Sequence, residues 1–185
     1  MQRDNLKLPR ALEVAGASIP IDADFRNVLE IMAAFEDDDL TDSERRMLLM
    51  ERLYKEPVSD ILQALEQAYW FLGGGNDKPH TGRGRDYGQL YSWVQDRIYI
   101  LAAVDAVLGY SCRGKRFVHW WDFLGAWMAV GDSTISNAIN LRKRKKQGKL
   151  TKDERRQWDD NPDFYELRTS SMDAADELMK LLQGG

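Results

Sequence analysis

The chain has 185 residues, of which 43% are apolar and 30% are charged, and it carries a net charge of −4. These values are typical of one globular domain, or at most two small ones, and they exclude an intrinsically disordered chain. Because the overall balance is acidic, any binding of nucleic acid has to depend on a local basic patch.

No run of about 18 apolar residues occurs, so we expect no membrane-spanning helix and no membrane partner. The first residues lack the apolar core of a secretory signal. A single cysteine, Cys112, excludes an intramolecular disulfide and is consistent with a reducing cytoplasm.

The segment ALEVAGASIPID (11–22) is short and rich in small residues around Gly16, which predicts a small β-hairpin or an extended arm. After it, the apolar residues of 25–35 recur at the i, i+3, i+4 and i+7 spacing of an amphipathic helix. Asp22 or Asp24 is expected to begin this helix as its N-cap.

Two further helices are expected before residue 73. Thr41 and Glu44 form a capping box, in which each side chain bonds the backbone N–H of the other residue, and this begins the second helix. Pro57 is expected in the first turn of the third helix, because proline is tolerated there. The apolar stripe of that helix runs over 61–72.

A glycine-rich segment, GGGNDKPHTGRGRDYG (73–88), separates this half of the chain from the second half. Its six glycines and one proline exclude regular structure and predict a loop between two helical halves. A long helix is expected after it, over about 89–108. The predicted apolar face of that helix consists of Leu90, Trp93, Val94, Ile98, Leu101, Val104 and Leu108.

Two more helices are expected toward the C-terminus. Asp132 or Ser133 caps a helix that runs to about Lys146. Thr151 and Glu154 form a second capping box, which begins a short helix ending near residue 160.

The segment FVHWWDFLGAWMAV (117–130) contains three tryptophans within eight residues. At helical spacing its apolar side chains lie on nearly every side, which predicts a buried central helix. Each indole N–H then needs a hydrogen-bond acceptor. The alternative is that one tryptophan marks a groove for a ligand or a partner.

His119 and Asp122 lie three residues apart, so their side chains can meet on one face of a helix. One interpretation is half of a catalytic site, but no GxSxG motif occurs and Cys112 lies in a turn beside basic residues. The other is a polar pair that ties this helix to a neighbour, with Asp96 and Asp105 as candidate partners. We expect no catalytic residues and no enzyme activity.

Metal and phosphate-loop motifs are also absent from the sequence. Two histidines and one cysteine occur at no ligand spacing, which argues against a metal site. The acidic run EDDDLTDSE (36–44) lacks the glycine and terminal glutamate of an EF-hand loop, and GGGNDK (73–78) lacks the phosphate-loop spacing. We expect neither a metal ion nor a cofactor.

The strongest charge feature is RKRKKQGKLTKDERR (142–156), with nine basic and two acidic residues. One interpretation is a strip that binds nucleic-acid phosphates. The alternative is a helix C-terminus whose basic residues complement the helix dipole and stay solvated. The candidate phosphate contacts are Arg142, Lys143, Arg144, Lys145 and Lys146.

Several segments in order resemble the bacteriophage gene-product-fifteen family, which is encoded in the tail-gene clusters of long-tailed phages and prophages. The resemblance covers roughly residues 10–168, and GYSCRGK (109–115) departs from the family pattern. The matching segments are IDADFRNVLEI (21–31), ALEQAYWFLGGG (64–75), WVQDRIYILAAVDAVLGY (93–110), VHWWDFLGAWMAV (118–130), Ser133–Arg142 and the DERR…FYEL close (153–167).

Together with this resemblance, the helical patterns predict a mainly α-helical, single-domain bundle of about six to seven helices, with a short N-terminal β-hairpin or extended arm. The domain spans 1–168, and residues 169–185 form a short amphipathic tail. The tryptophan block is expected to be a packing signature. Its residues, with the aspartate of the preceding helix, are His119, Trp120, Trp121, Asp122, Phe123, Trp127 and Asp96.

The resemblance also implies a role in phage tail assembly, as a non-enzymatic chaperone that binds the tape-measure protein in the host cytoplasm. Expected partners are phage tail proteins, namely the tape measure and another tail chaperone. Association of the chain with copies of itself into homo-oligomers is a further possibility that the sequence leaves undecided. The alternatives are a structural tail or connector component of the virion and a nucleic-acid-binding protein using residues 142–149. The candidate partner contacts, with packing at the edge of the core as the alternative, are Trp70, Phe71, Tyr87, Tyr91 and Trp158.

Overall fold

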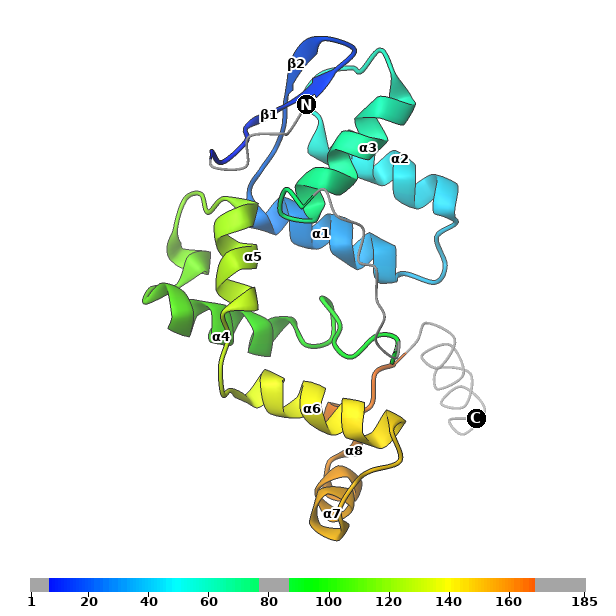
Figure 1. Cartoon of the computed structure of the whole chain (residues 1–185), viewed down its shortest axis with the longest axis vertical. Helices are drawn as coiled ribbons and strands as arrows, with labels where there is room; N and C mark the ends of the chain where they lie inside the picture. The colour runs from blue at the N-terminus through cyan, green and yellow to red at the C-terminus, as the bar shows by residue number, and fades with distance from the viewer. Residues whose placement is uncertain (1–6, 77–86, 169–185) are drawn as a thin grey trace, which may run out of the picture.

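Short helices make up most of the regular structure in the computed structural model, which describes residues 7–76 and 87–168 (Figure 1). The predicted mainly helical fold with an N-terminal hairpin is confirmed. The elements in chain order are β1 (Ala11–Val14), β2 (Ala17–Pro20), α1 (Phe25–Glu36), α2 (Asp42–Leu53), α3 (Ile61–Leu72), α4 (Arg97–Leu108), the 3-10 helix η1 (Cys112–Gly114), α5 (Trp120–Met128), α6 (Thr134–Lys146), α7 (Lys152–Asp160) and α8 (Pro162–Tyr165).

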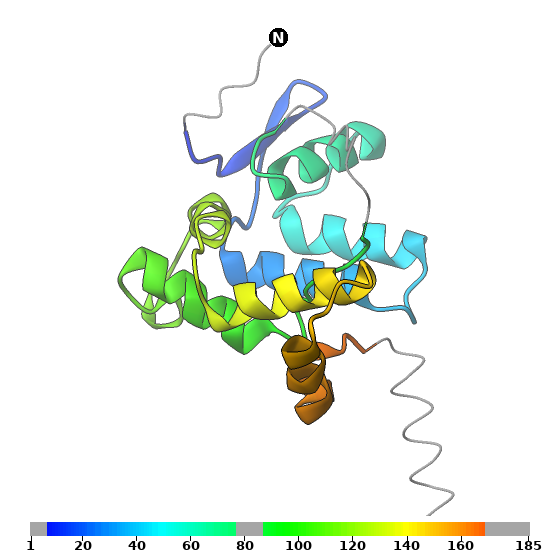
Figure 2. The same cartoon turned by 60° about the horizontal axis from the view of Figure 1, so that its bottom comes forward.

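The helices are arranged around one large core and one small cluster. Figure 1 shows the hairpin and α3 at one end of the molecule and α7 at the other, with α1, α4 and α5 between them. The large core takes buried residues from β1 to the start of α6. The small cluster lies between α6, α7 and α8, which come forward in Figure 2. It consists of Ala138, Leu141, Trp158 and Tyr165.

The hairpin is antiparallel and closed by a two-residue turn, with Val14 paired to Ala17. Ala15 and Gly16 both have positive φ angles, of 50° and 80°, as the type I′ turn of such hairpins requires. Leu12 and Val14 are buried while Glu13 between them is exposed. This alternation places one face of β1 in the core.

The predicted caps of α1 and α2 are confirmed. The Asp24 carboxylate accepts the backbone N–H of Arg26 at 2.9 Å, and the Thr41 capping box is complete. The prediction for Pro57 is wrong, because α3 begins only at Ile61, after the N-cap Asp60. The Asp60 carboxylate accepts a backbone N–H of the first turn at 3.0 Å, so a capping side chain sets this helix start.

The predicted long helix over 89–108 is also too long, because α4 begins at Arg97. Before it, the Ser92 hydroxyl oxygen accepts the backbone N–H groups of Val94 and Gln95 at 3.1 and 2.9 Å. Glu36 of α1 accepts the backbone N–H of Trp93 at 2.9 Å and the Ser92 hydroxyl at 2.7 Å. These side chains satisfy backbone donors that a helix would otherwise use, and so favour a turn.

The tryptophan helix α5 is buried on one side only. Trp120 and Phe123 are fully buried, as predicted. Trp121 and Trp127 are half-buried, and Met128 is 79% exposed. The prediction of a helix buried all round is therefore wrong, because the core ends at the face that carries Met128.

Two indole groups of α5 connect it to the end of α3. The Trp120 Nε1–H donates to the carbonyl of Leu72 at 2.9 Å, and the Trp121 Nε1–H donates to that of Phe71 at 2.8 Å. The last carbonyls of a helix have no partner inside the helix. The Trp120 indole supplies that partner for Leu72, and the Trp121 indole adds a donor to the Phe71 carbonyl, which also accepts the Gly74 backbone N–H at 3.1 Å. In this way the two indoles join the two halves of the chain.

Replacing Trp120 with phenylalanine removes one of these donors and leaves the Leu72 carbonyl buried without its partner. We expect the Trp120→Phe variant to lose about 2–4 kcal/mol of unfolding free energy, measured by urea denaturation. Met128→Ala on the same helix is the control and should change stability by less than about 0.5 kcal/mol. Equal losses in the two variants would contradict this role of the indole.

Candidate functional site

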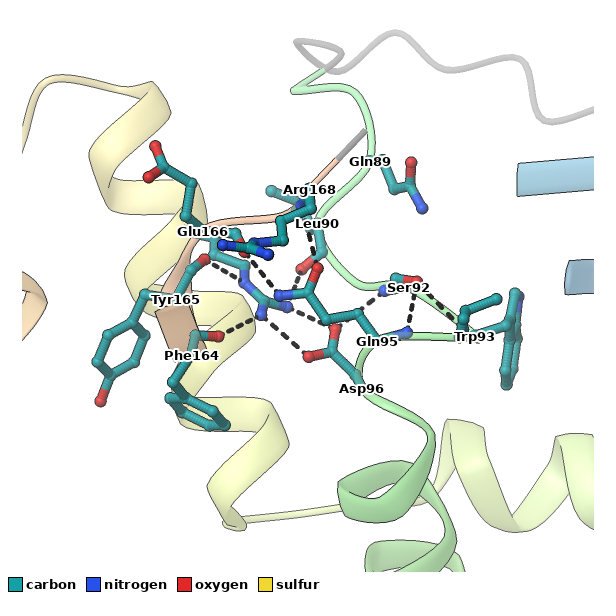
Figure 3. A network of polar contacts seen from close by, with 12 residues as sticks. Gln89, Leu90, Ser92, Trp93, Gln95, Asp96, Phe164, Tyr165, Glu166 and Arg168 are labelled. Atoms are coloured by element: carbon teal, nitrogen blue, oxygen red, sulfur yellow. Dashed lines mark hydrogen bonds and ion pairs between the residues drawn. The ribbon is translucent and has the colours of Figure 1, made fainter. Parts of the chain in front are cut away.

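A buried ion pair between Arg142 and Asp96 is the most densely bonded polar feature of the described residues (Figure 3). The guanidinium Nη1 and Nη2 atoms donate to the two Asp96 carboxylate oxygens at 2.6 and 3.0 Å. Asp96 also accepts the backbone N–H of Ser92 at 2.9 Å. Arg142 is only 2% exposed, so its predicted role as a phosphate contact is wrong.

The remaining Arg142 donors bond backbone carbonyls of two other segments. Nε donates to Tyr165 at 2.7 Å, Nη2 to Phe164 at 2.8 Å and Nη1 to Leu90 at 3.2 Å. Every N–H of the guanidinium group, which has five, thus has an acceptor. One side chain of α6 thereby holds α8 and the turn before α4 in place. The role of the Arg142–Asp96 pair is therefore to join these three segments.

The other predicted phosphate contacts also have partners within the chain. Lys143 lies over the Tyr87 ring, and Arg144 pairs with Glu154 at 2.8 Å. Lys145 lies over the Trp158 ring, with its Nζ 3.6 Å from the ring centre, and is 3.9 Å from a Glu166 carboxylate oxygen. Lys146 donates to the Tyr87 and Gln89 carbonyls at 2.8 and 2.7 Å. These interactions favour the interpretation as a solvated helix end.

His119 caps α5 instead of pairing with Asp122. Its Nδ1 accepts the backbone N–H of Trp121 at 3.0 Å, and its Nε2 lies 2.9 Å from the Pro9 carbonyl. Nε2 therefore carries the proton of the neutral ring. Burial lowers the pKa of His119 below its usual value. The predicted polar pair is not formed, because Asp122 is exposed while Asp96 is committed to Arg142.

Asp105 and Cys112 form a local contact at the end of α4. The Asp105 carboxylate accepts the backbone N–H of Cys112 at 2.7 Å, and burial raises the pKa of the Cys112 thiol to about 12. A thiol of that pKa is almost fully protonated near neutral pH, so it is a poor nucleophile. Asp105 therefore acts in the turn after α4 and is not a partner of His119.

Two kinds of feature are absent from residues 7–76 and 87–168, the part of the chain that the structure describes. Within these ranges no three His, Cys, Asp or Glu side chains lie where they could hold a metal ion. None of the helices in the same ranges has both the length and the apolar character needed to cross a membrane.

The predicted partner-binding aromatics do not form one exposed patch. Phe71 is fully buried and Trp158 is 7% exposed, so both predictions are wrong: their rings fill the large core and the small cluster. Trp70, Tyr87 and Tyr91 are half-buried. Trp70 packs on Trp121, and Tyr91 packs on Trp127, each with ring centres 5.3 Å apart. Packing at the edge of the core accounts for these positions.

An exposed apolar surface that sequence reasoning missed lies along α4. Ile98 is 71% exposed and Val94 just before the helix is also exposed, although the sequence pattern predicts both on the apolar face that packs into the core. Further exposed apolar residues continue this surface, and they are small at its centre. We call it the α4 face, and it consists of Val94, Ile98, Tyr99, Ala102, Ala106 and Tyr110.

The α4 face exists because the helix is apolar on both sides. Its other side carries Ile100, Leu101 and Val104 into the core, against α5 and α6. Only Arg97 and Asp105 are charged in the helix. An apolar stripe on every side is typical of a helix that is fully covered. This composition was the signal available in the sequence, and an uncovered helix of this kind marks an interaction surface.

Removing the guanidinium of Arg142 would leave the Asp96 carboxylate buried without its counter-charge. We expect Arg142→Met to lose about 3–5 kcal/mol of unfolding free energy in urea denaturation. Its neighbour Lys143→Met is the matched control, with a change below about 0.5 kcal/mol. A double variant of Arg142→Met with Asp96→Asn should lose less than the sum of the two single variants. A loss below about 1 kcal/mol in Arg142→Met would contradict this assignment.

The lowered pKa of His119 gives a pH dependence with a defined sign. Its pKa is lower in the folded than in the unfolded state, so the unfolded chain binds the extra proton first as the pH falls below about 6.5. The stabilisation is present above that pH and is lost as the pH falls through the folded pKa. Asparagine at this position keeps a capping acceptor but does not titrate. We therefore expect the drop in Tm between about pH 7.5 and about pH 5 to be smaller in His119→Asn than in the natural chain.

Comparison with known proteins identifies the family. No curated protein and no solved structure matches the chain. The sequence profile described as bacteriophage Gp15 protein matches residues 5–167, a range that includes the Arg142–Asp96 pair, the two capping indoles and the α4 face. The predicted resemblance is therefore confirmed, and the chain belongs to the bacteriophage Gp15 protein family.

Proposed function

We propose that the chain is a non-enzymatic tail-assembly chaperone, which acts in the host cytoplasm by binding the tape-measure protein during tail morphogenesis. Family membership supports a phage-protein partner. The single observation that carries the proposal is the α4 face, an apolar helix surface whose central residues Ile98, Ala102 and Ala106 are exposed. A helical partner with its own apolar stripe has the matching chemistry.

The shape of the α4 face suits a helix better than a flat surface. Ile98, Ala102 and Ala106 follow each other at four-residue spacing, which places them in one row along α4. The two alanines lower the centre of the row, so a partner helix can approach closely, as in ridge-and-groove packing. A tape-measure protein with exposed apolar stripes would be protected from aggregation by such a cover until the tail tube encloses it.

The competing functions receive less support from the described residues. A nucleic-acid-binding strip needs basic side chains that are available to phosphates, whereas Arg142 is buried and its basic neighbours have partners within the chain. A structural tail or connector component would use the same α4 face. It differs in its location, since it would be present in purified virions and a chaperone would be absent from them.

Co-expression of the full chain with helical fragments of a tape-measure protein, followed by affinity capture, tests the proposal. We expect Ile98→Asp combined with Ala102→Asp to weaken binding by about 10–100-fold, because a buried Ile contributes about 1.5–3 kcal/mol. Leu62→Asp is the matched control, since Leu62 is 81% exposed on α3. Failure of the natural chain to retain any tail protein would overturn the proposal, as would equal binding by the double variant.

A further inference from the structure

The α4 face raises the question of what covers it in the free protein. Its exposed side chains come from the turn before α4, from the helix and from the residues just after it. Within the described residues, α5, α6 and η1 pack on the other sides of the helix. A second helix lying along Ala102 and Ala106 would remove these apolar atoms from water.

The chain leaves the described structure beside the N-terminal end of the α4 face. The backbone N–H of Arg168 donates to the Gln95 side-chain oxygen at 3.0 Å, and the Gln95 amide donates to the Glu166 carbonyl at 2.6 Å. Figure 3 shows Arg168 next to Gln95 in this network. The Phe164 ring contacts the Tyr99 ring of the face, with ring centres 4.9 Å apart. The described part of the chain therefore ends at Arg168, beside the N-terminal end of the α4 face.

The length of residues 169–185 matches the length of the surface. As a helix, 17 residues would extend about 25 Å, whereas the 12 residues of α4 extend about 18 Å. The segment is thus long enough to lie along the whole of α4, even if its first few residues serve only as a connection.

The sequence of the segment is amphipathic in the way that this surface requires. At helical spacing its apolar residues fall on one side and its charged residues on the other. The apolar side holds Met172, Ala175, Leu178, Met179 and Leu182, and the opposite side holds Asp173, Asp176, Glu177 and Lys180.

Charge also favours this segment as the occupant. Its three acidic residues outnumber its single lysine, Lys180. Arg97 is the first residue of α4, and its guanidinium also pairs with Glu30 at 3.1 Å. At the C-terminal end of the face the Lys115 Nζ lies 4.9 Å from the Tyr110 ring centre, and Arg113 lies 3.9 Å from an Asp105 carboxylate oxygen. Ion pairs at such a rim add little affinity but favour one partner over others.

We propose that residues 169–185 form an amphipathic helix that packs on the α4 face of the same chain. Because the two are covalently connected, the effective concentration of the segment at the face is in the millimolar range. A separate helix must therefore displace it before binding there. The docking itself does not rest on the tail-assembly role. Only the further statement that a tape-measure helix competes with the segment for the α4 face rests on the proposed function.

Disulfide formation between introduced cysteines in the full chain tests the docking. The segment follows Arg168 at the N-terminal end of the face, so a docked helix runs parallel to α4 with Met172 near Ile98. Met179 then lies near Ala106, because each is about two turns further along its helix. The test pair is therefore Ala106→Cys with Met179→Cys. We expect fast disulfide formation within one chain at a rate independent of protein concentration. The matched control is Leu62→Cys with Met179→Cys, which should react far more slowly, because Leu62 lies on α3. The natural Cys112 is fully buried and is present in both pairs.

Two outcomes would overturn the inference. Equal rates in the two pairs would show that the segment does not prefer the α4 face. Disulfides formed only between chains, at a rate that rises with concentration, would assign the face to a second copy of the chain.

A second measurement uses substitutions in the segment itself. Changing Met172, Met179 and Leu182 to Ser in the full chain should uncover the α4 face and raise the fluorescence of an apolar-surface dye several-fold. Lys180→Ser on the charged side is the control and should leave the fluorescence unchanged. No increase in the triple variant would overturn the docking.

The same triple variant separates the two proposals. With docking and the chaperone role both correct, it captures more tape-measure fragment than the natural chain does. Capture without any disulfide preference for Ala106 overturns the docking alone. A strong disulfide preference with no capture by any variant overturns the proposed function alone.

Discussion

The buried charge of Arg142 constrains how the C-terminal half of the chain can pack. An ionised guanidinium is costly to bury unless every donor finds an acceptor and its charge is balanced. Asp96 supplies the charge, and the carbonyls of Leu90, Phe164 and Tyr165 supply the remaining acceptors. Three segments far apart in sequence must therefore meet at α6. This requirement explains why α8 lies there and why the chain exits beside α4.

A second constraint links the halves of the chain through the tryptophan block. Trp120 and Trp121 donate to the last carbonyls of α3, while His119 caps the helix that carries both indoles. Three adjacent side chains thus satisfy two helix ends. Within this block the aromatic rings serve packing, and the chemistry of the polar atoms is used for capping.

These two constraints leave α4 with a surplus of apolar surface. The helix packs against α5 and α6 with one side and presents Ile98, Ala102 and Ala106 with the other. Polar residues on that outer side would have stabilised the helix in water just as well. Both proposals, binding of a partner helix and docking of the chain's own C-terminal segment, depend on this apolar row.

The sequence by itself determined the features that depend on neighbouring residues. Asp24, Thr41, Ser133 and Thr151 begin helices as expected, because a cap needs only the next three residues. Even the family was readable from the tryptophan block and its flanking segments. The tryptophan block correctly marked Trp120 and Phe123 as core residues, whereas its helical stripe also included Met128, which is exposed.

Only the tertiary structure decided the features that depend on distant partners. The start of α4, the burial of Arg142 and the exposure of Ile98 follow from contacts with Glu36, with Asp96 and with the neighbouring helices. Local sequence does not encode which apolar side of α4 the core will use, or which arginine of a basic run will find a buried carboxylate. Periodicity shows which side chains can be buried, whereas the packing of distant segments selects those that are.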